Sequence, residues 1–521
     1  MQENQELPKG WVWTKIGQIA STSSGGTPSR SNPSYFTGTI PWIKSGELGD
    51  GEVSEHTEFI SEEALANSSA KLFPKGTLLI ALYGATVGKV GVLTMDAATN
   101  QAVCGIFLPP WVELKFAFNY LLSLRREFIE QGKGGAQPNI SQDIVRNTPF
   151  PLAPLPEQRR IVAKLEELFS RLDAGVATLR QTQAQLKRYR QSVLHAAVTG
   201  ELTRAWRAAH PEPTESGAAL LQRIRAERRA QWEAAQLAKR GGQLPLGDAW
   251  KKKYEEPAAP DTSELPELPQ GWVWASPEQI ASSDKYSMAI GPFGSNLKVP
   301  DYREEGVPLV FVREIKSGKF GGPKTKYVTP AKAEELRAHQ VASGDILITK
   351  MGEPPGDACL YPEGRPDAVI TADCIKWTLD SNLENKEFYV YAINAHLVRV
   401  QIAFITQGVA QQKVSLGRFK TVAVPVPSLE EQTEIVREVE RRLSVIDYLE
   451  KNITAELTRA ERLRQSILHR AFTGRLVPQD AADEPAAALL ERLQDAPATQ
   501  PAAKGKRGRK ARESGQTALN L

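Results

Sequence analysis

The chain has 521 residues, carries 65 Lys and Arg against 61 Asp and Glu, and is 41% hydrophobic. That length accommodates roughly three or four ordinary domains. No run of about 18 apolar residues occurs, and no charged-then-apolar leader, so we expect neither a membrane span nor a secretory signal. The three cysteines form no CxxC pair and the six histidines show no metal-ligand spacing, which predicts a reduced, cytoplasmic setting without a bound metal.

Residues 1–150 alternate short strands and turns, which predicts a mixed α/β domain with more strand than helix. The predicted strands are Ile40–Ile43, Thr77–Tyr83, Lys89–Thr94 and Ala102–Leu108, followed by a helix near Phe116–Gln131. Lys and Arg number 12 against 14 Asp and Glu in this segment. Bulk charge therefore does not by itself indicate a nucleic-acid partner.

Several polar and glycine residues of this domain lie in loops or at strand ends, where they can contact phosphate or base edges. In the loop 23–30, glycines permit close backbone approach, although a tight turn between strands explains them equally well. Gln137 and Asn139 precede a helix, and we interpret them as structural or phosphate-positioning residues rather than base readers. The candidates are Gly25, Gly26, Thr27, Ser29, Arg30, Lys44, Tyr83, Lys89, Asn100, Gln101, Gln137 and Asn139.

Residues 151–200 contain the first of two long amphipathic helices. Apolar residues recur from Ile161 with a 4-3 spacing, which is the period of a coiled-coil seam rather than of a helix on a broad core. Flanking prolines and Gly200 bound the helix. Its predicted seam comprises Ile161, Leu165, Leu168, Leu172, Leu179 and Leu186.

Residues 201–265 are expected to hold a short charged helix, about Ala218–Lys239, and a Pro-rich linker. Residues 266–425 then repeat the organisation of the first domain, with strands at Val307–Val312, Asp345–Lys350 and Asp373–Leu379 and a helix near Lys386–Gln407. Polar and basic residues in the corresponding loops are the second set of DNA-contact candidates. They are Ser295, Asn296, Lys298, Arg313, Lys316, Lys350, Gln411 and Gln412.

A second long helix is predicted in residues 426–475, and residues 476–521 hold a short helix and a basic tail that we expect to be disordered. The second helix follows the same 4-3 spacing and is the natural partner of the first. Its predicted seam comprises Ile435, Val439, Ile446, Leu449, Ile453, Leu463 and Ile467.

The chain is thus an internal duplication. LPKGWVWTKIGQIA at Leu7–Ala20 returns as LPQGWVWASPEQIA at Leu268–Ala281, an offset of 261 residues. The helix end RYRQSVLHAAVTG at Arg188–Gly200 returns as RLRQSILHRAFTG at Arg462–Gly474, an offset of 274. Similarity is strong at the domain edges and helices and weak inside the domains, as expected for one scaffold that carries two binding surfaces.

These motifs, together with GGTPS at Gly25–Ser29 and the loops GGAQPNIS (Gly134–Ser141) and GVAQQKVS (Gly408–Ser415), resemble the specificity subunit of type I restriction–modification systems. The resemblance implies two target-recognition domains, each reading half of a split, asymmetric site in double-stranded DNA. It also implies that two long helices form an antiparallel coiled coil as a spacer. Two modification subunits and two restriction subunits would dock on this scaffold, carrying S-adenosylmethionine, ATP and Mg²⁺, with no cofactor in this chain.

Two other classes of function remain open on sequence alone: a self-contained nuclease or methyltransferase, and a coiled-coil scaffold without DNA specificity. The enzyme class requires a complete motif, and each one is defective. NPSY at Asn32–Tyr35 lacks the second proline of an amino-methyltransferase loop, and GATVGK at Gly84–Lys89 is one residue short of a P-loop. Asp301, Glu314 and Lys316 have only the outline of a nuclease metal site. We therefore expect a non-catalytic specificity subunit.

Overall fold

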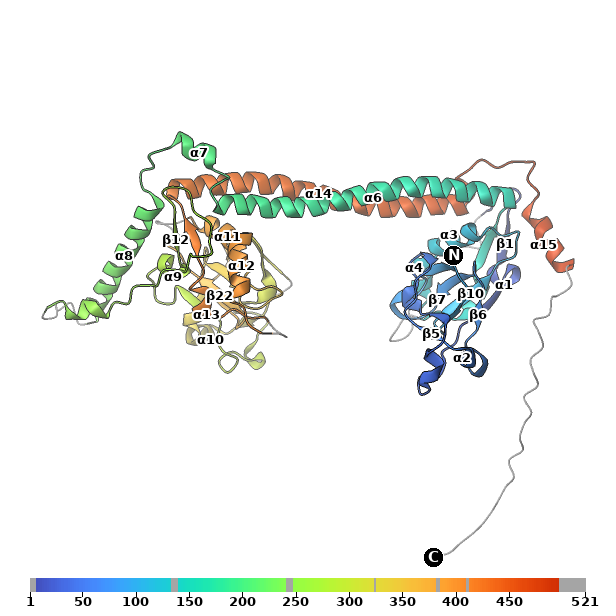
Figure 1. Cartoon of the computed structure of the whole chain (residues 1–521), viewed down its shortest axis with the longest axis horizontal. Coiled ribbons are helices and arrows are strands. Elements are labelled where there is room, and N and C mark those ends of the chain that lie inside the picture. Colours follow the sequence, from blue (N-terminus) through green and yellow to red (C-terminus); the bar gives the residue numbers. More distant parts are fainter. Residues whose placement is uncertain are drawn as a thin grey trace, which may run out of the picture. The chain divides into compact units, whose positions relative to one another are not determined.

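The computed structural model describes residues 6–132, 139–239, 247–322, 325–380, 385–408 and 412–495. The chain divides into two compact units (Figure 1). Unit 1 comprises Met1–Thr178 and Glu456–Leu521, and unit 2 comprises Leu179–Ala455. Each unit holds one globular domain and a stretch of each of the two long helices. None of the described helices is long and apolar enough to cross a membrane.

The domain of unit 1 is built on two sheets. The first has the strand order β2 (Ser21–Ser24), β10 (Val103–Phe107), β7 (Leu78–Ala81), β8 (Val90–Leu93) and β4 (Gly51–Val53). The second has the order β5 (Phe59–Ile60), β3 (Ile40–Ile43), β9 (Ala97–Thr99) and β6 (Leu72–Phe73). A separate antiparallel pair joins β1 (Val12–Lys15) to β11 (Pro149–Leu152), and so brings the two ends of the domain together. The helices are α1 (Ile16–Ile19), α2 (Glu62–Asn67), α3 (Leu114–Ser123), α4 (Arg125–Gln131), α5 (Gln142–Asn147) and, after the second long helix, α15 (Ala486–Asp495).

The domain of unit 2 repeats this topology except that its first sheet has no counterpart of the edge strand β4. One sheet has the order β13 (Met288–Ile290), β22 (Cys374–Trp377), β19 (Ile346–Thr349) and β20 (Ala358–Leu360). The other has the order β17 (Tyr327–Val328), β14 (Val307–Val310), β21 (Ala368–Ile370) and β18 (Gln340–Val341). The pair of β12 (Val273–Ala275) with β23 (Val424–Val426) corresponds to β1 with β11. Its helices are α9 (Pro277–Ile280), α10 (Pro330–Glu335), α11 (Lys386–Asn394), α12 (His396–Phe404) and α13 (Leu416–Phe419), and a small hairpin joins β15 (Ile315–Lys316) to β16 (Lys319–Phe320). The duplication predicted from sequence is therefore a duplication of fold.

Residues 116–131 and 386–407, each predicted to be one helix, form two helices each. The break after α3 falls at Leu124, where the Ser123 hydroxyl donates a hydrogen bond of 2.6 Å to the Tyr120 carbonyl. In the second domain the break falls at Ala395, which has an extended backbone. The preceding Asn394 side chain is buried and bonds both backbone groups of Ala358 in β20. Side-chain bonds to backbone groups compete with continuous helix, and periodicity alone does not reveal them.

The two long helices are α6 (Leu155–Val198) and α14 (Leu429–Phe472). Within each unit a stretch of α6 lies beside a stretch of α14 (Figure 1). Arg464 pairs with Asp173 in unit 1, and Arg190 pairs with Asp447 in unit 2. Adding the repeat offset of 274 converts Asp173 into Asp447 and Arg190 into Arg464, so these are one contact made twice. The end of one helix meets the beginning of the other in both units, which is the antiparallel coiled coil that the family resemblance implied.

The buried stripe of these helices differs from the predicted seam in one of its two rows. The row through Leu165, Leu172, Leu179 and Leu186 is half-buried or buried, and so is the row through Val439, Ile446, Ile453 and Ile467. The second row is buried or half-buried as predicted at Ile161, Leu168 and Ile435, but lies one residue later than predicted further along α14. Leu449 and Leu463 are 39% and 49% exposed, whereas Glu450, Leu457 and Arg464 are half-buried in their place.

The reason for this shift is that charged residues take some of the seam positions. Glu450 accepts a hydrogen bond of 3.1 Å from Arg190, and the Arg464 guanidinium lies 4.4 Å from the centre of the Phe169 ring. Long charged side chains can cover apolar surface while their head groups form ion pairs. A count based on apolar residues therefore assigns those positions to the neighbouring leucines.

Each domain core is continuous with the helix ends of its own unit. In unit 1, Ile161 and Leu165 of α6 and Leu468 of α14 join the core that contains Trp11 and Phe116. In unit 2, Val193, Leu194 and Ala197 of α6 and Ile435 and Val439 of α14 join the core that contains Trp272 and Trp377. Burial of this apolar surface fixes each domain on its stretch of coiled coil.

The segment between the repeats belongs to unit 2. It contains α7 (Arg204–Ala209), α8 (Gly217–Ala238) and the short 3-10 helix η4 (Ala249–Lys253). Leu220 and Ile224 of α8 are buried in the second domain core, and the Arg228 guanidinium donates to the Ala281 carbonyl at 3.0 Å. This insertion is therefore packed onto the second domain over its first turns rather than serving as a free linker.

Candidate nucleic-acid interface

The loop after β2 is held by backbone contacts that only glycine permits. Gly25 N donates to the Val103 carbonyl at 3.0 Å, and Gly26 N donates to the Thr99 carbonyl at 2.9 Å. A Cβ on Gly25 would lie 2.1 Å from Thr99 Oγ1, and one on Gly26 would lie 2.2 Å from Ser69 C. The glycine pair thus presses the loop onto the sheet. The side chains that follow it, Thr27, Ser29 and Arg30, are exposed.

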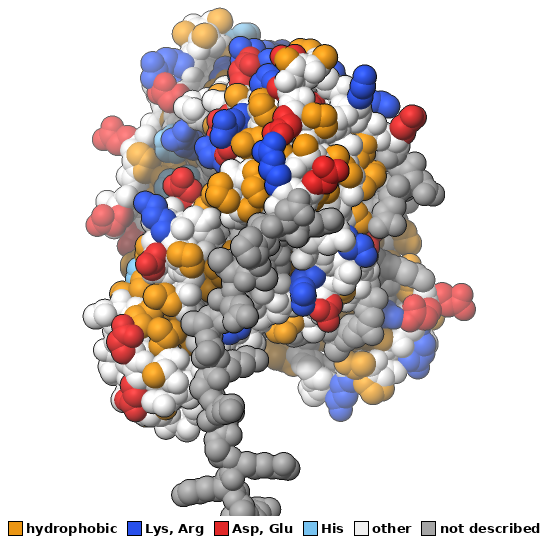
Figure 2. Space-filling model, turned by 90° about the vertical axis from the view of Figure 1, so that its right-hand side faces the viewer, with side chains coloured by type: hydrophobic (Ala, Val, Ile, Leu, Met, Phe, Trp, Pro, Cys, Tyr) orange, Lys and Arg blue, Asp and Glu red, His pale blue; other side chains and the backbone are white. Residues whose placement is uncertain are grey.

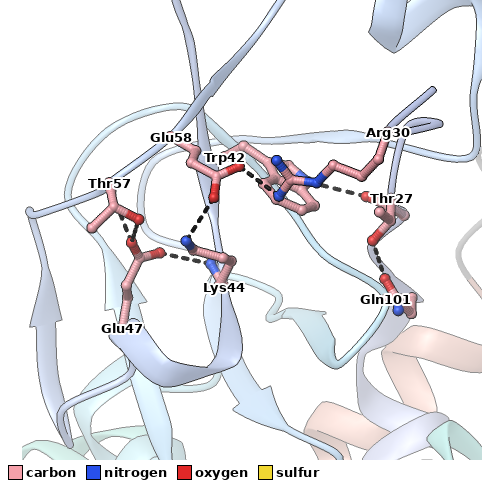
Figure 3. A network of polar contacts seen from close by, with 9 residues as sticks. Thr27, Arg30, Trp42, Lys44, Glu47, Thr57, Glu58 and Gln101 are labelled. Carbon is pink, nitrogen blue, oxygen red and sulfur yellow. Dashed lines mark hydrogen bonds and ion pairs between the residues drawn. The ribbon is translucent and has the colours of Figure 1, made fainter. Parts of the chain in front are cut away.

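Arg30 and Lys44, predicted separately, share one carboxylate. The Arg30 guanidinium lies 2.6 Å and the Lys44 ammonium 2.9 Å from Glu58 (Figure 3). The hydrogen bond from Lys44, together with that from Arg30, lowers the pKa of Glu58 below its ordinary value. Arg30 also stacks over Phe36, with its guanidinium carbon 4.1 Å from the ring centre. Two cations are thereby held side by side at the ends of β2 and β3, where a phosphate could bridge them.

Glu47 organises the loop that carries Lys44. Its carboxylate accepts bonds of 2.7 Å from Lys44 N and 2.8 Å from Thr57 N (Figure 3). In the second domain Glu314 accepts a bond of 2.8 Å from Phe311 N in the same way. Sequence reasoning missed Glu47 and Glu58. The available signal was acidic residues that lie 3 and 14 positions after Lys44, which is too common a spacing to single them out.

The remaining candidates of the first domain form two further pairs. The Thr27 hydroxyl bonds the Gln101 side chain (Figure 3), and Tyr83 forms a backbone bridge with Asn139. Asn100 is half-buried, and its Oδ1 is buried without a hydrogen-bond partner among the described residues. Lys89 lies apart from both pairs, half-buried at the start of β8. Gln137 falls outside the residues that the structure describes.

In the second domain the loop after β13 is pressed down in the same manner. Gly291 N donates to the Cys374 carbonyl at 3.1 Å, and a Cβ there would lie 1.9 Å from the Thr371 carbonyl oxygen. The predicted residues Ser295, Asn296 and Lys298 are exposed beyond it. Phe293, which was not among the residues predicted from sequence, is 71% exposed on the same loop.

The other candidates of the second domain are spread more widely. Arg313 is exposed and stacks over Phe311, 4.2 Å from its ring centre. Lys350 is half-buried, and its ammonium donates to the Ala372 carbonyl at 3.1 Å, so it supports the backbone. Lys316 is exposed in the β15–β16 hairpin, and Gln412 is exposed before α13. Gln411 lies outside the described residues.

The two domains place different chemistry on matching positions. Trp42 N donates to the Glu58 carbonyl at 3.0 Å, and Leu309 N donates to the Lys326 carbonyl at 2.8 Å, so Glu58 corresponds to Lys326. By the same comparison Lys44 corresponds to Phe311. The first domain has a cation pair on a carboxylate, where the second has an aromatic ring, a stacked arginine and a lysine.

The outline of a nuclease metal site at Asp301, Glu314 and Lys316 does not form one. Asp301 accepts a bond of 2.7 Å from Lys298 N, and Glu314 is buried with its bond to Phe311 N. Across the described part of the chain, no group of three or more His, Cys, Asp and Glu side chains could hold a metal ion. Both carboxylates are committed to backbone structure.

Comparison with known proteins identifies the family. A family model described as the type I restriction modification DNA specificity domain matches residues 8–188 and 315–459. The chain belongs to this family. It is a non-catalytic specificity subunit of the type I restriction–modification class, as the sequence motifs predicted.

Specificity subunits of known type I enzymes are similar over nearly the whole chain. That of EcoKI from Escherichia coli (strain K12) is 26% identical over 521 residues, covering 94% of this chain and 96% of its own. That of StySPI from Salmonella potsdam is 24% identical over 516 residues, with the same coverage of 94% and 96%. A chain solved in work on complex assembly and conformational transition of the type I R-M system has a TM-score of 0.62 at 18% identity. It covers 90% of this chain and 100% of its own, which shows the shared fold.

Charge on this specificity subunit is mixed at the scale of whole domains. The face shown in Figure 2 intersperses Lys and Arg with Asp and Glu and gathers no large area of one sign. This matches the near balance of the sequence, 65 cations against 61 anions. Positive charge is instead placed locally, as at Arg30 and Lys44.

Proposed function

We propose that this specificity subunit recognises a bipartite, asymmetric site in double-stranded DNA and that each domain reads one half of it. The observation that carries the proposal is the pairing of a shared framework with different side chains. Glu47 and Glu314 hold equivalent loops in the same way, but those loops present Lys44 in one domain and Phe311 in the other. Two copies of one reader would select two identical half-sites, whereas different contacts select different ones.

In the first domain, we propose that Arg30 and Lys44 position the phosphate backbone and that Thr27 and Gln101 face base edges. An amide can read adenine bidentately, and a hydroxyl is a versatile partner. In the second domain, Ser295, Asn296 and Lys298 would make the corresponding contacts, together with Arg313. These loops are suited to DNA contact because glycines anchor them on a rigid sheet while the side chains at their ends are exposed.

We further propose that α6 and α14 scaffold two modification and two restriction subunits. Apolar side chains remain exposed on these helices: Tyr189, Val445, Tyr448, Leu449 and Leu463 are 47%, 53%, 65%, 39% and 49% exposed. Apolar residues left exposed next to a formed seam are typical of surfaces that a partner covers. S-adenosylmethionine, ATP and Mg²⁺ would then act on those partners, and the assembly would work in the cytoplasm where the DNA is.

Mapping of N6-methyladenine in a strain with and without this gene tests the recognition role. Loss of one split motif is the expected result. Gln101→Ala and Asn296→Ala, made separately, are expected to relax the motif in opposite halves. An unchanged methylome, in a strain whose modification subunits are active, would refute the proposal. Relaxation of both halves by either variant would refute the assignment of one half to each domain.

We also propose that helix length sets the spacing of the two half-sites. Deleting residues 176–182 and 455–461 removes one heptad from each helix and keeps the register of both ion pairs. The expected result is a motif with a shorter spacer or loss of binding, since a heptad shortens a helix by about 10 Å. Methylation at the original spacing would contradict the idea. A deletion of residues 176–182 alone, which breaks the register, is the control for loss of folding.

A further inference from the structure

One cavity in the second domain lies at the end of the sheet opposite the DNA-contact candidates. Lys350 and Arg313 follow the carboxyl ends of β19 and β14, whereas the cavity borders Asp345, which precedes β19, and Thr378, which follows β22. Its volume is about 270 Å³. The cavity therefore lies apart from the proposed recognition surface.

Lys376, in the middle of the central strand β22, lines this cavity and is 92% buried, with 8% of its surface exposed. Burial lowers the pKa of this lysine, and the nearby Asp345 and Asp284 oppose that effect. No carboxylate in the described part of the chain lies within ion-pair distance of its ammonium group. A charge at such a position is costly without an ion-pair partner, and an anionic ligand in the cavity would offset that cost.

In the first domain, aromatic side chains fill the space that corresponds to this cavity. Gly105 pairs with Leu79 in the central strand as Lys376 pairs with Leu347, so the two positions correspond. The Phe73 ring packs on Gly105, where an added Cβ would lie 2.8 Å from it. A second ring, Phe107, meets Phe73 edge-to-face at 5.3 Å. The space is filled by an apolar plug.

In the second domain every member of that plug is replaced by a smaller or more polar residue. Register and backbone bonds match Phe73 with Val341, Thr77 with Asp345 and Phe107 with Thr378, in addition to Gly105 with Lys376. Four matched changes on one face of the sheet replace two rings with a lysine, a carboxylate, a hydroxyl and an open volume. Simple drift in packing would be expected to retain an apolar filling, because an unpaired buried charge destabilises the fold.

Of the three carboxylates that line the cavity, the exposed Asp367 lies at the rim, and the other two accept hydrogen bonds. Asp345 is buried and accepts bonds from Ala342 N at 2.8 Å and from the Thr378 hydroxyl. Asp284 accepts a bond of 2.8 Å from the Ser282 hydroxyl. Among the described residues, the ammonium of Lys285 contacts only Tyr286, and the exposed Arg337 makes only a long contact of 3.8 Å with Glu334.

Tyr286 adds a strained backbone to the rim. Its φ is 71°, in the left-handed region that residues other than glycine rarely adopt. Strain of this kind is kept where it places a side chain for a purpose. Here it brings the Tyr286 hydroxyl and the Lys285 ammonium to the same opening.

We propose that this cavity is a binding site for a phosphoryl group, held by the ammonium of Lys376 with Lys285, Arg337 and the Tyr286 hydroxyl around it. Three cations and a hydroxyl line the cavity beside its carboxylates, and a compact dianion supplies several acceptor oxygens in a volume of this size. The phosphoryl group is that of free phosphate or of a nucleotide, and the experiment distinguishes the two.

The test uses the full-length chain and Lys376→Met, which keeps the bulk of the side chain and removes its charge. Inorganic phosphate is titrated at constant ionic strength, with chloride as the balancing anion, and followed by calorimetry and thermal unfolding. We expect saturable binding and a rise in Tm for the natural chain. We expect at least a tenfold loss of affinity for Lys376→Met. Lys252→Met, an exposed lysine of η4 in the same unit, is the matched control and should bind normally.

Folding of the variant is checked without phosphate. Because Lys376→Met removes an unpaired buried charge, its Tm should equal or exceed that of the natural chain. A parallel titration with AMP identifies the source of the phosphoryl group: tighter binding than phosphate indicates a nucleotide, and equal or weaker binding indicates the free anion. Absence of saturable binding of either probe to the natural chain, or equal binding by Lys376→Met, would overturn the proposal.

Discussion

The indole nitrogen of Trp11 donates a hydrogen bond of 2.9 Å to the carboxylate of Glu157, which joins the start of the first domain to the first turn of α6. Trp272 makes the equivalent bond of 2.7 Å to Glu431. The two carboxylates differ in what else they contact. Glu431 also accepts from Thr203 and Arg207, whereas Oε1 of the buried Glu157 has no partner among the described residues.

Trp11→Phe should therefore cost more stability than Trp272→Phe. The first substitution leaves a buried carboxylate without its donor, at a cost of about 1–3 kcal/mol. The second leaves Glu431 with its hydroxyl and guanidinium donors. Denaturant unfolding of the two variants, monitored by far-UV circular dichroism because a tryptophan is removed, measures the difference. Equal costs would show that the two bonds are interchangeable despite their surroundings.

Glu157→Gln should change how stability depends on pH. Burial raises the pKa of Glu157, with the Trp11 bond and Arg160 opposing, so the folded chain holds this proton above the ordinary glutamate pKa. A raised carboxyl pKa contributes stability that is present at low pH and is lost as pH rises toward the folded-state value.

The measurement is the difference in unfolding free energy between Glu157→Gln and the natural chain from pH 4 to pH 8. The unfolding free energy of Glu157→Gln should increase relative to that of the natural chain as pH rises above about 4.5, the ordinary pKa of glutamate. A difference that stays constant across the range would contradict the prediction. Glu431→Gln, which breaks the ion pair with Arg207, should lose stability at neutral pH and serves as the contrasting case.

The shifted seam predicts a contrast between two neighbouring positions of α14. Ile446 is 1% exposed and Leu449 is 39% exposed. Ile446→Ala should cost about 2–5 kcal/mol through lost burial and a cavity, whereas Leu449→Ala should cost less than about 1 kcal/mol. Equilibrium denaturation checks both. A larger loss of stability for Leu449→Ala would instead support the seam positions predicted from sequence.

Glu58→Gln should release the two cations that the carboxylate now holds. Arg30 and Lys44 would both become free for phosphate, so binding to non-target duplex should tighten and depend more steeply on salt. Each added phosphate contact steepens the slope of log Kobs against log salt by about 0.9. Glu62→Gln, an exposed residue on α2 of the same domain, is the control. A slope unchanged from that of the natural chain would exclude these cations from the DNA interface.

The duplication, both long helices and the strands at the domain centres could be predicted from sequence because they depend on local pattern. β3 occupies the predicted Ile40–Ile43, and the other central strands lie within their predicted segments. The breaks at Leu124 and Ala395 could not be predicted, since they accompany side-chain bonds to backbone, within the turn at Ser123 and to distant Ala358 at Asn394. Only one of the two rows of the seam was predicted in full for a similar reason. The charged residues Glu450 and Arg464 can occupy seam positions because residues of the opposite helix pair with them or pack against them.

The candidate site, too, could be predicted only in part from the sequence. Residue type and loop position selected Arg30 and Lys44, but nothing in the sequence indicated that both contact Glu58. Lys350 was selected for its charge and proves to support the Ala372 carbonyl. Pairing between residues far apart in the chain decides which cations are free, and only the fold brings those residues together.

The ion pairs Arg190–Asp447 and Arg464–Asp173 carry one more consequence. A single repeat already contains both members of this contact, Asp173 and Arg190, 17 positions apart on one helix. The surface is therefore self-complementary, the property that defines an isologous interface between identical subunits. Gene fusion of such a pair would convert a symmetric homodimer into one polypeptide. Each repeat could then diverge separately, because a mutation would change one repeat and not both subunits of a homodimer.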